Sequence, residues 1–295
     1  MSGKSTKEIT RDYFDSLMLE MRLIDSAVPD TGLKLYGQRF ETPVMTAALS
    51  HLGTFNPEMP DGMIQYALGA KLSGAVHWIG MGSDEEFQKV AATGAKTIRV
   101  IKPYADEEKI FGRIRCAEES GALAVGMDID HMFDRKGNPD LCMGEQMAPK
   151  SAADLKRYVD STSLPFVIKG VLSVSDAKKC LEIGAGGIVV SHHGGRLSGA
   201  VPPLFLLPEI VKAVEGKIPV FADCGFCSGM DVYKALALGA TAVSVGGHLI
   251  PYIRKGGEEA VAGRIREMTE ELRGAMAYTG VKNLSEFDAS VLHRV

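Results

Sequence analysis

Short apolar runs rich in β-branched residues recur along the chain, and a segment with helical spacing of apolar residues follows each of them. This alternation predicts βαβ units and a parallel sheet. Most runs are hydrophobic almost throughout, as expected of strands covered on both faces. The predicted strands are Pro43–Ala48, Ala75–Met81, Thr97–Lys102, Ala122–Asp130, Pro165–Gly170, Gly187–His193, Pro219–Gly225 and Ala242–Gly247.

The segments between these runs complete a series of strand and helix pairs that fits a closed barrel. We therefore predict the α/β class and a (β/α)8 TIM barrel. Ser83, Ser151 and Ser173 stand where helices are expected to begin, and serine is a favoured N-cap residue. The predicted helices are Asp61–Leu72, Asp84–Ala92, Glu107–Ser120, Ala152–Ser161, Val174–Ile183, Leu204–Val214, Gly229–Leu238 and Glu258–Tyr278.

The residues before the first strand predict an amphipathic helix over Lys7–Met21 and a hairpin over Leu33–Glu41, with Gly37 at its turn. We expect residues 1–42 to form a plug over the barrel floor, residues 43–280 the barrel, and residues 281–295 a C-terminal tail. A chain of 295 residues is close to the ~250 that one such barrel needs. No linker or low-complexity tract divides it, so a single domain is predicted.

Composition excludes several classes of partner. The formal charge of −4 at pH 7 provides no basic field for nucleic acid or for an anionic membrane. No run of ~18 apolar residues predicts a membrane span, and the polar start does not resemble an export signal. The five cysteines are too few for a disulfide scaffold. We predict a cytoplasmic protein that binds a small molecule.

The predicted strand ends carry chemistry that a plain core would not need. In a (β/α)8 barrel the site lies at the C-terminal ends of the strands. A buried charge at such a position costs several kcal/mol unless a partner or ligand compensates it. Ionisable groups and glycines are concentrated there, at Lys102–Tyr104, Asp128–His131, Lys169–Gly170, Ser191–Arg196, Asp223–Gly225 and Gly246–Gly247.

Glycines after the last two strands indicate an anion site. Gly225, Gly229 and the pair Gly246–Gly247 leave backbone N–H groups free where barrels commonly hold phosphate. Such glycines suit an ordinary turn equally well, but Lys169 and the helix start at Gly229 favour an anion. A phosphate-bearing ligand is therefore predicted.

Cys224 and Cys227 form a C-x-x-C pair in the loop after the seventh strand. Such a pair can be redox-active or half of a metal site, but no second pair accompanies it. Ordinary loop cysteines are the favoured interpretation, and no metal site is predicted.

The segment VIKGVLSVSDAKKCLEIGAGGIVVSHHGGR, from Val167 to Arg196, and the later DVYKALALGATAVSVGG resemble the FMN-dependent 2-hydroxy acid oxidases and dehydrogenases. This family includes glycolate oxidase and lactate oxidase, and the resemblance extends from about Met21 to the C-terminus. It implies FMN as cofactor, a small L-2-hydroxy acid as substrate, a 2-oxo acid as product, and a homo-oligomer, a tetramer in this family.

The resemblance also implies roles for individual residues. His193 matches the catalytic base, Asp130 the aspartate that orients it, and Arg196 the arginine that binds the substrate carboxylate. Tyr104 matches an active-site tyrosine, and Lys169 the lysine beside flavin N1 and O2. The positions expected to contact FMN are Ala47, Ala48, Lys102, Asp128, Lys169, Ser191, Asp223, Gly225, Cys227, Gly246 and Gly247.

These residue types suit the chemistry independently of the resemblance. An imidazole with an ordinary pKa near 6.5 can accept the hydroxyl proton of the substrate, which suits His193. The planar guanidinium of Arg196 can hold a carboxylate through two hydrogen bonds. A fixed ammonium such as Lys169 can stabilise negative charge that develops on a reduced flavin.

The chain departs from the family at positions that matter. Cys227 and Gly247 stand where the family has phosphate-binding arginines, so phosphate would be held by backbone N–H groups, the helix start at Gly229 and His248. Other family positions are also changed: Lys102 stands for glutamine, Asp128 for threonine, His192 for asparagine and Ala48 for proline.

Two alternatives therefore stay open. One is a flavin barrel with reductive or isomerase-type chemistry, for which type 2 isopentenyl diphosphate isomerase is the nearest comparison. The other is a flavin-free binding barrel, which the missing arginines would explain. The presence of Lys169, Asp130, His193 and Arg196 favours the oxidation of a 2-hydroxy acid over both.

Overall fold

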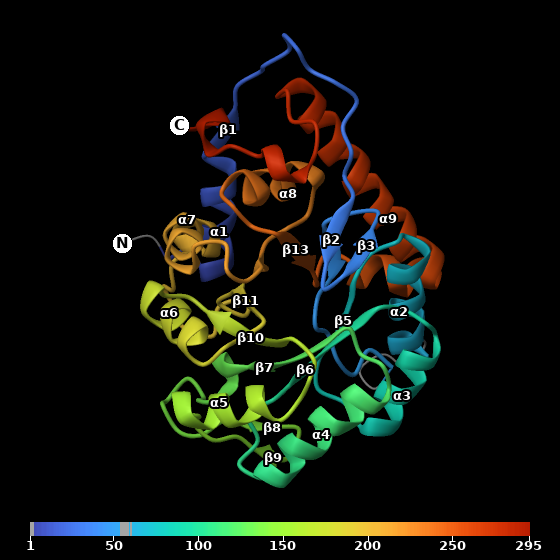
Figure 1. Ribbon diagram of the computed structural model, residues 1–295, viewed down its shortest axis with the longest axis vertical. Coiled ribbons are helices and arrows are strands. Elements are labelled where there is room, and N and C mark those ends of the chain that lie inside the picture. Colours follow the sequence, from blue (N-terminus) through green and yellow to red (C-terminus); the bar gives the residue numbers. More distant parts are fainter. Residues whose placement is uncertain (1–2, 54–58, 60) are drawn as a thin grey trace.

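The computed structural model describes residues 3–53, 59 and 61–295. Eight parallel strands form one sheet in the order β4-β13-β12-β11-β10-β7-β6-β5, and a bridge between Leu49 and Ile79 joins its two edges (Figure 1). The predicted (β/α)8 barrel is confirmed. Its strands are β4 (Val44–Thr46), β5 (His77–Ile79), β6 (Thr97–Ile101), β7 (Ala124–Asp128), β10 (Phe166–Val171), β11 (Gly187–Val190), β12 (Val220–Ala222) and β13 (Ala242–Val245).

The helices around the barrel begin and end close to their predicted bounds. Ser83, Ser151 and Ser173 each accept a hydrogen bond from a backbone N–H in the first turn, which confirms the three caps. The helices are α2 (Gly62–Leu72), α3 (Asp84–Ala92), α4 (Glu107–Glu119), α5 (Ala152–Asp160), α6 (Val174–Glu182), α7 (Pro203–Val214), α8 (Gly229–Ala237) and α9 (Ile250–Tyr278).

The last helix differs from its prediction, because α9 begins at Ile250 rather than at Glu258. Gly256 and Gly257 interrupt it with non-helical backbone angles. Glycine costs a helix about 1 kcal/mol relative to alanine, so the local pattern breaks there although helical residues lie on both sides. No helix in the described ranges is long and apolar enough to cross a membrane.

The N-terminal helix is shorter than predicted. Helix α1 (Thr6–Asp15) starts at a capping box formed by Ser5 and Glu8. Beyond it, β1 (Leu17–Leu19) pairs antiparallel with β14 (Leu292–Arg294) near the C-terminus. Local spacing favoured a helix through Met21, but a strand partner from the far end of the chain decides the conformation.

The hairpin of β2 (Leu33–Leu35) and β3 (Gln38–Phe40) closes the barrel floor. Tyr36 and Gly37 both have positive φ, as a tight hairpin turn requires. Leu33, Leu35 and Phe40 pack into one apolar cluster with inward-facing residues of the barrel strands. Helix α1 has no part in this floor, because it lies at the opposite end of the barrel, where Thr10 contacts His192 just beyond β11.

Two connections beyond the strands complete the fold. A 3-10 helix, η1 (Ile129–His131), and a small hairpin of β8 (Leu141–Cys142) and β9 (Glu145–Gln146) lie between β7 and α5. The tail after α9 contains η2 (Leu284–Glu286), η3 (Ala289–Val291) and β14. Asp130 and His131 therefore lie just past their strand, in a connection that can bring them over the barrel mouth.

Candidate active site

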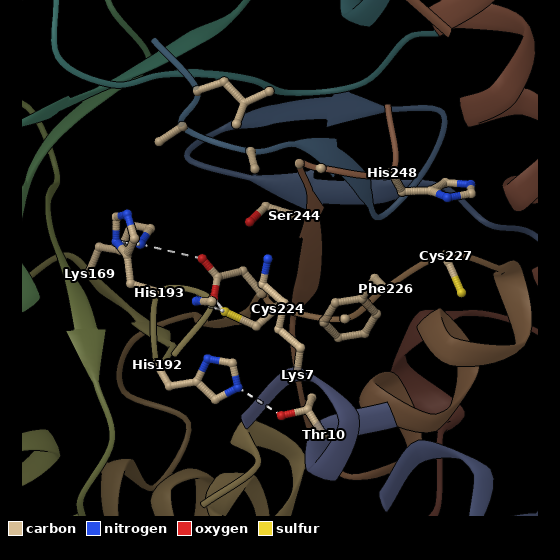
Figure 2. Close-up of a pocket in the computed structure, with 18 residues that line it drawn as sticks. Lys7, Thr10, Lys169, His192, His193, Cys224, Phe226, Cys227, Ser244 and His248 are labelled. Carbon is tan, nitrogen blue, oxygen red and sulfur yellow. Dashed lines mark hydrogen bonds and ion pairs between the residues drawn. The ribbon is translucent and has the colours of Figure 1, made fainter. Parts of the chain in front are cut away.

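A cavity of about 450 Å³ opens at the C-terminal ends of the strands. This volume lies in the ~300–1,000 Å³ range of small-molecule pockets. Figure 2 shows Lys169 and His193 at one side of it, and His248 and Cys227 at the other. Of the predicted site residues, the lining includes Ala47, Ala48, Lys169, His193, Asp223, Gly225, Cys227, Gly246 and Gly247.

Lys169 is the buried cation at the centre of three carboxylates. Its Nζ lies 3.3 Å from Asp128, 3.4 Å from Asp223 and 3.8 Å from Asp130. Burial favours the neutral amine, but the carboxylates outweigh this effect and raise the pKa of Lys169 well above its ordinary value. The ammonium is therefore held charged at one end of the cavity.

Lys102 and Asp128, predicted as flavin contacts, bind each other. Lys102 Nζ donates to Asp128 Oδ2 at 2.7 Å, and both residues are buried. Burial alone would raise the pKa of Asp128, but Lys102 and Lys169 hold it well below its usual range. Neither Lys102 nor Asp128 is among the residues that line the cavity, so this pair supports Lys169 from behind.

His193 and Asp130, the predicted base and its orienting aspartate, are in contact. His193 Nδ1 lies 2.9 Å from Asp130 Oδ1 and 3.4 Å from Asp128 Oδ2. Burial favours the neutral ring, but Asp128 and then Asp130 outweigh it and raise the pKa of His193 above 6.5. The hydroxyl of Ser191 accepts the backbone N–H of His193 and fixes the start of this loop.

Carboxylates and histidines in this cluster could also suit a metal ion. Ligand atoms of Asp128, Asp130, His131 and His193 all lie within 4.8 Å of one another. Lys169 Nζ lies 3.3 Å from Asp128 and 3.8 Å from Asp130, so an ammonium already compensates the charge of these carboxylates. The cluster is better explained as an ion-pair network around the lysine.

Two residues to which the sequence assigned no role, His131 and Asp140, join the predicted base to the predicted arginine. His131 Nε2 lies 3.2 Å from His193 Nε2, and its Nδ1 lies 3.0 Å from Asp140 Oδ2. Arg196 Nη2 donates to the same Asp140 oxygen at 2.6 Å and to the carbonyl of Phe133. Proximity of His131 to Asp130 in the sequence was the only local signal.

Tyr104 lies apart from this network. It is buried, its ring faces Lys109 Nζ at 4.6 Å, and its backbone pairs with Met147. Burial raises the pKa of its hydroxyl to about 12. The residue is not among those that line the cavity, and the contacts given for it place it against the connection between β7 and α5.

Helix α1 supplies two cavity residues that sequence reasoning missed, Lys7 and Thr10. Thr10 Oγ1 donates to Thr6 O, so it accepts from His192 Nε2 at 2.8 Å. The lone pair of His192 then resides on Nδ1, which is buried and has no hydrogen-bond partner in the described part of the chain. An unpaired buried acceptor beside a cavity indicates a ligand that donates a hydrogen bond.

The opposite end of the cavity is built differently from the prediction. The N–H of Gly229, at the start of α8, donates to Glu271 Oε2 at 2.5 Å and is not free for phosphate. An arginine enters from α9 instead. Arg264 donates to the carbonyl of Cys227 at 2.7 Å and to His248 Nε2 at 3.0 Å.

The two loop cysteines are turned to separate partners. Cys224 Sγ donates to Asp223 at 2.9 Å, and Cys227 Sγ to Asp231 at 3.2 Å. Burial, with these carboxylates, raises the pKa of both thiols, which keeps them protonated. The geometry supports the interpretation of ordinary loop cysteines.

Comparisons with known proteins agree with this geometry. The sequence profile of the FMN-dependent dehydrogenase family matches residues 2–154 and 134–294. The chain belongs to this family. It is 31% identical to 4-hydroxymandelate oxidase of Amycolatopsis orientalis, over 86% of this chain and 80% of that one, and 30% identical to 2-hydroxyacid oxidase 1 of Homo sapiens, over 99% and 90%.

Solved structures of family members are similar over the whole chain. Mandelate oxidase with (S)-2-phenylpropionate superposes with a TM-score of 0.87, at 30% identity, covering 100% of this chain and 90% of that one. A mandelate oxidase variant with a C4a-OH-FMN adduct gives a TM-score of 0.88, also at 30% identity, with coverage of 100% and 92%. The chain is therefore an oxidoreductase of a flavoprotein family, and FMN is its cofactor.

The residues present fit FMN. Lys169 provides a cation at one end of the cavity, and His192 Nδ1 an unpaired acceptor along it. At the other end, a Cβ built on Gly247 would meet no atom of the described residues within 4 Å, so there is room there for an anion. His248 lines this end of the cavity, and Arg264 places a guanidinium behind it, in contact with the His248 ring and the Cys227 carbonyl.

This open space predicts that Gly247→Arg tightens FMN binding. The new side chain has room, and a charge-assisted hydrogen bond to the phosphate is worth ~1.5–3 kcal/mol, or about 10-fold or more in Kd. Cys227 is a poorer site for this test, because Arg11 Nη1 already lies 3.5 Å from its sulfur. Quenching of FMN fluorescence on titration measures the Kd. Gly274 is exposed, so the control Gly274→Arg adds the same charge away from the cavity and should leave the Kd for FMN unchanged. An unchanged Kd for Gly247→Arg would contradict this placement of the phosphate.

Proposed function

We propose that this protein oxidises a small L-2-hydroxy acid to the 2-oxo acid, with His193 as the base. The observation that carries the proposal is the contact of His193 Nδ1 with Asp130 at 2.9 Å, beside Lys169 and at the edge of the cavity. A carboxylate this close to an imidazole stabilises the protonated ring, which is the form that a base reaches when it has taken a proton.

Each charged group then has one task. Asp130 Oδ1 lies 2.9 Å from His193 Nδ1, where its charge can stabilise the imidazolium that forms when His193 Nε2 takes the hydroxyl proton of the substrate. Lys169 holds a permanent positive charge where negative charge would develop on the cofactor. When bound, FMN supplies the acceptor for the hydride equivalent.

Arg196 is the group that would bind the carboxylate of the substrate. It lies three residues after His193 in the same loop, and it already holds a carboxylate, that of Asp140. Among the relatives, the named activities are oxidation of 4-hydroxymandelate, glycolate and 2-hydroxyacids. These names support a substrate with a carboxylate next to a hydroxyl.

We also propose a single domain over residues 1–295, a cytoplasmic location and a homo-oligomer, with a tetramer expected from the family. The five cysteines are all free, which suits a reducing compartment. Size-exclusion chromatography with light scattering would test the assembly.

Anaerobic stopped-flow mixing with glycolate, lactate, mandelate and longer 2-hydroxy acids tests the proposed reaction. At least one of them should bleach the flavin absorbance of the purified protein. If none does, reductive or isomerase-type chemistry takes the place of oxidation. Purified protein that neither contains nor binds flavin would support the binding barrel instead.

The rate of flavin reduction by a subsaturating 2-hydroxy acid is expected to rise with pH. The base must be unprotonated, and the pKa of His193 is raised above 6.5, so the active form grows as pH increases through that raised value. The midpoint should therefore lie above pH 6.5, and His193→Gln should abolish the dependence. Stopped-flow rates from pH 5 to 9 measure it, and a rate that falls over this range would contradict the assignment of His193 as base.

A further inference from the structure

The segment between β7 and α5 occupies the hydrogen-bonding atoms that a 2-hydroxy acid would need. Asp140 places a carboxylate oxygen 2.6 Å from Arg196 Nη2, and His131 places a ring nitrogen 3.2 Å from His193 Nε2. A 2-hydroxy acid carries the same two features, a carboxylate for the arginine and a hydroxyl for the histidine. The protein chain itself therefore makes, through Asp140 and His131, the two contacts that a 2-hydroxy acid would make.

The contact at Arg196 and the contact at His193 are linked through Asp140. Asp140 Oδ2 accepts from Arg196 and also lies 3.0 Å from His131 Nδ1, so one carboxylate orients both. Burial lowers the pKa of His131 to about 3, so its ring is neutral. With its Nδ1–H donated to Asp140, His131 presents the Nε2 lone pair to His193, which has the raised pKa and supplies the proton.

All four side chains are held away from bulk water but not sealed. Asp140 and His131 are 13% and 11% exposed, whereas Arg196 and His193 are 28% and 33% exposed. The segment has glycines with positive φ at Gly137 and Gly144, and its hairpin is held to α4 by a contact of Glu145 with Lys109 at 2.5 Å. The segment contributes no strand to the eight-stranded sheet, so a displacement of Asp140 and His131 would leave the barrel strands paired.

We propose that Asp140 occupies the carboxylate site of the substrate on Arg196, and that a 2-hydroxy acid binds by displacing Asp140 together with His131. This inference rests on the proposed function of the same site. The exchange conserves charge, because one carboxylate replaces another on Arg196. Asp140 is then an internal competitor that weakens binding and selects ligands able to replace both contacts.

The test is the affinity of Asp140→Asn and Asp140→Ala for an analogue that cannot react. 2-Hydroxyisobutyrate carries the carboxylate and the hydroxyl but has no Cα hydrogen to lose, and it is titrated against the absorbance spectrum of the FMN-loaded protein. Both variants should bind it about 10-fold or more tightly than the unchanged protein, because an ionic competitor for Arg196 is gone. In both variants, the KM for the 2-hydroxy acid that reduces the flavin fastest should also fall.

Two controls separate this effect from a looser segment and from charge alone. Glu145→Gln removes one negative charge and one anchor of the same segment without touching Arg196, and its affinity should stay within about twofold of the unchanged protein. Isobutyrate lacks the hydroxyl and cannot replace His131 at His193. Its affinity should therefore increase less in Asp140→Asn than the affinity of 2-hydroxyisobutyrate does.

The possible outcomes distinguish this inference from the proposed function. Weaker binding in both Asp140 variants would mean that Asp140 positions Arg196 for the substrate, and it would overturn the inference while the reaction stands. An affinity for 2-hydroxyisobutyrate that increases as much in Glu145→Gln as in the Asp140 variants would overturn the inference as well. If no 2-hydroxy acid reduces the flavin of the unchanged protein or of either variant, the proposed function itself fails.

Discussion

Replacement of His193 by alanine is expected to slow anaerobic flavin reduction by ~10²- to 10⁴-fold, the usual share of a general base. The ring of His193 lines the cavity, and its Nδ1 lies 2.9 Å from the carboxylate of Asp130. FMN should stay bound, because Lys169 and the glycine-rich end of the cavity are unchanged. The substitution should therefore lower the rate of flavin reduction while the affinity for substrate stays nearly unchanged.

Stopped-flow reduction over a range of substrate concentrations measures the two quantities independently. The matched control is His293→Ala, which removes an exposed histidine paired with Glu20 at 2.7 Å, far along the chain from the site. It should reduce at the rate of the unchanged protein. A His193→Ala rate within about tenfold of that rate would assign the base to another group.

Replacement of Lys169 by methionine should cause the largest loss of stability. Methionine fills much of the same volume but leaves Asp128, Asp130 and Asp223 without the cation that lies 3.3 to 3.8 Å from them. Removal of one partner from a buried ion pair costs ~3–5 kcal/mol. For a domain of this size, that lowers Tm by roughly 6 to 20 °C. The variant should also retain less FMN.

Calorimetry of the protein stripped of flavin separates the loss of stability from the loss of the ligand. Lys156→Met provides the control, since that lysine is 50% exposed and its pair with Asp160 lies on the surface of α5. Its free energy of unfolding should change by no more than ~0.5 kcal/mol. A Tm for Lys169→Met equal to that of Lys156→Met would show that the carboxylates find other compensation.

Much of the barrel could be predicted because its pattern is local. A parallel strand covered on both faces must be apolar along its length, and a helix packed on one side must repeat apolar residues every three or four positions. Strand ends were predicted slightly too long, because the predicted ranges ran past the apolar residues to His193 and Gly225, which take positive φ and turn the chain away. The family motif then assigned His193, Asp130 and Lys169, which the fold brings together.

Contacts between distant parts of the chain were beyond local reasoning. Thr10 contacts His192, which is 182 residues away in the sequence, and Arg264 contacts Cys227, which is 37 residues away. Neither α1 nor α9 has a residue pattern that reveals which end of the barrel it approaches. Asp140 is likewise one of several acidic residues in an irregular connection, and only its 2.6 Å contact with Arg196 distinguishes it.

The sequence by itself determined the barrel, the family, the cofactor and the central charged residues. All of these depend on periodicity or on an ordered motif, which short stretches of chain carry within them. Tertiary structure alone decided that Glu271 accepts the first N–H of α8, that Arg264 binds the Cys227 carbonyl, and that Asp140 holds Arg196. These outcomes depend on which side chains meet after the strands close, and the free energy of a pair contact is set by its distance and burial, neither of which is encoded locally.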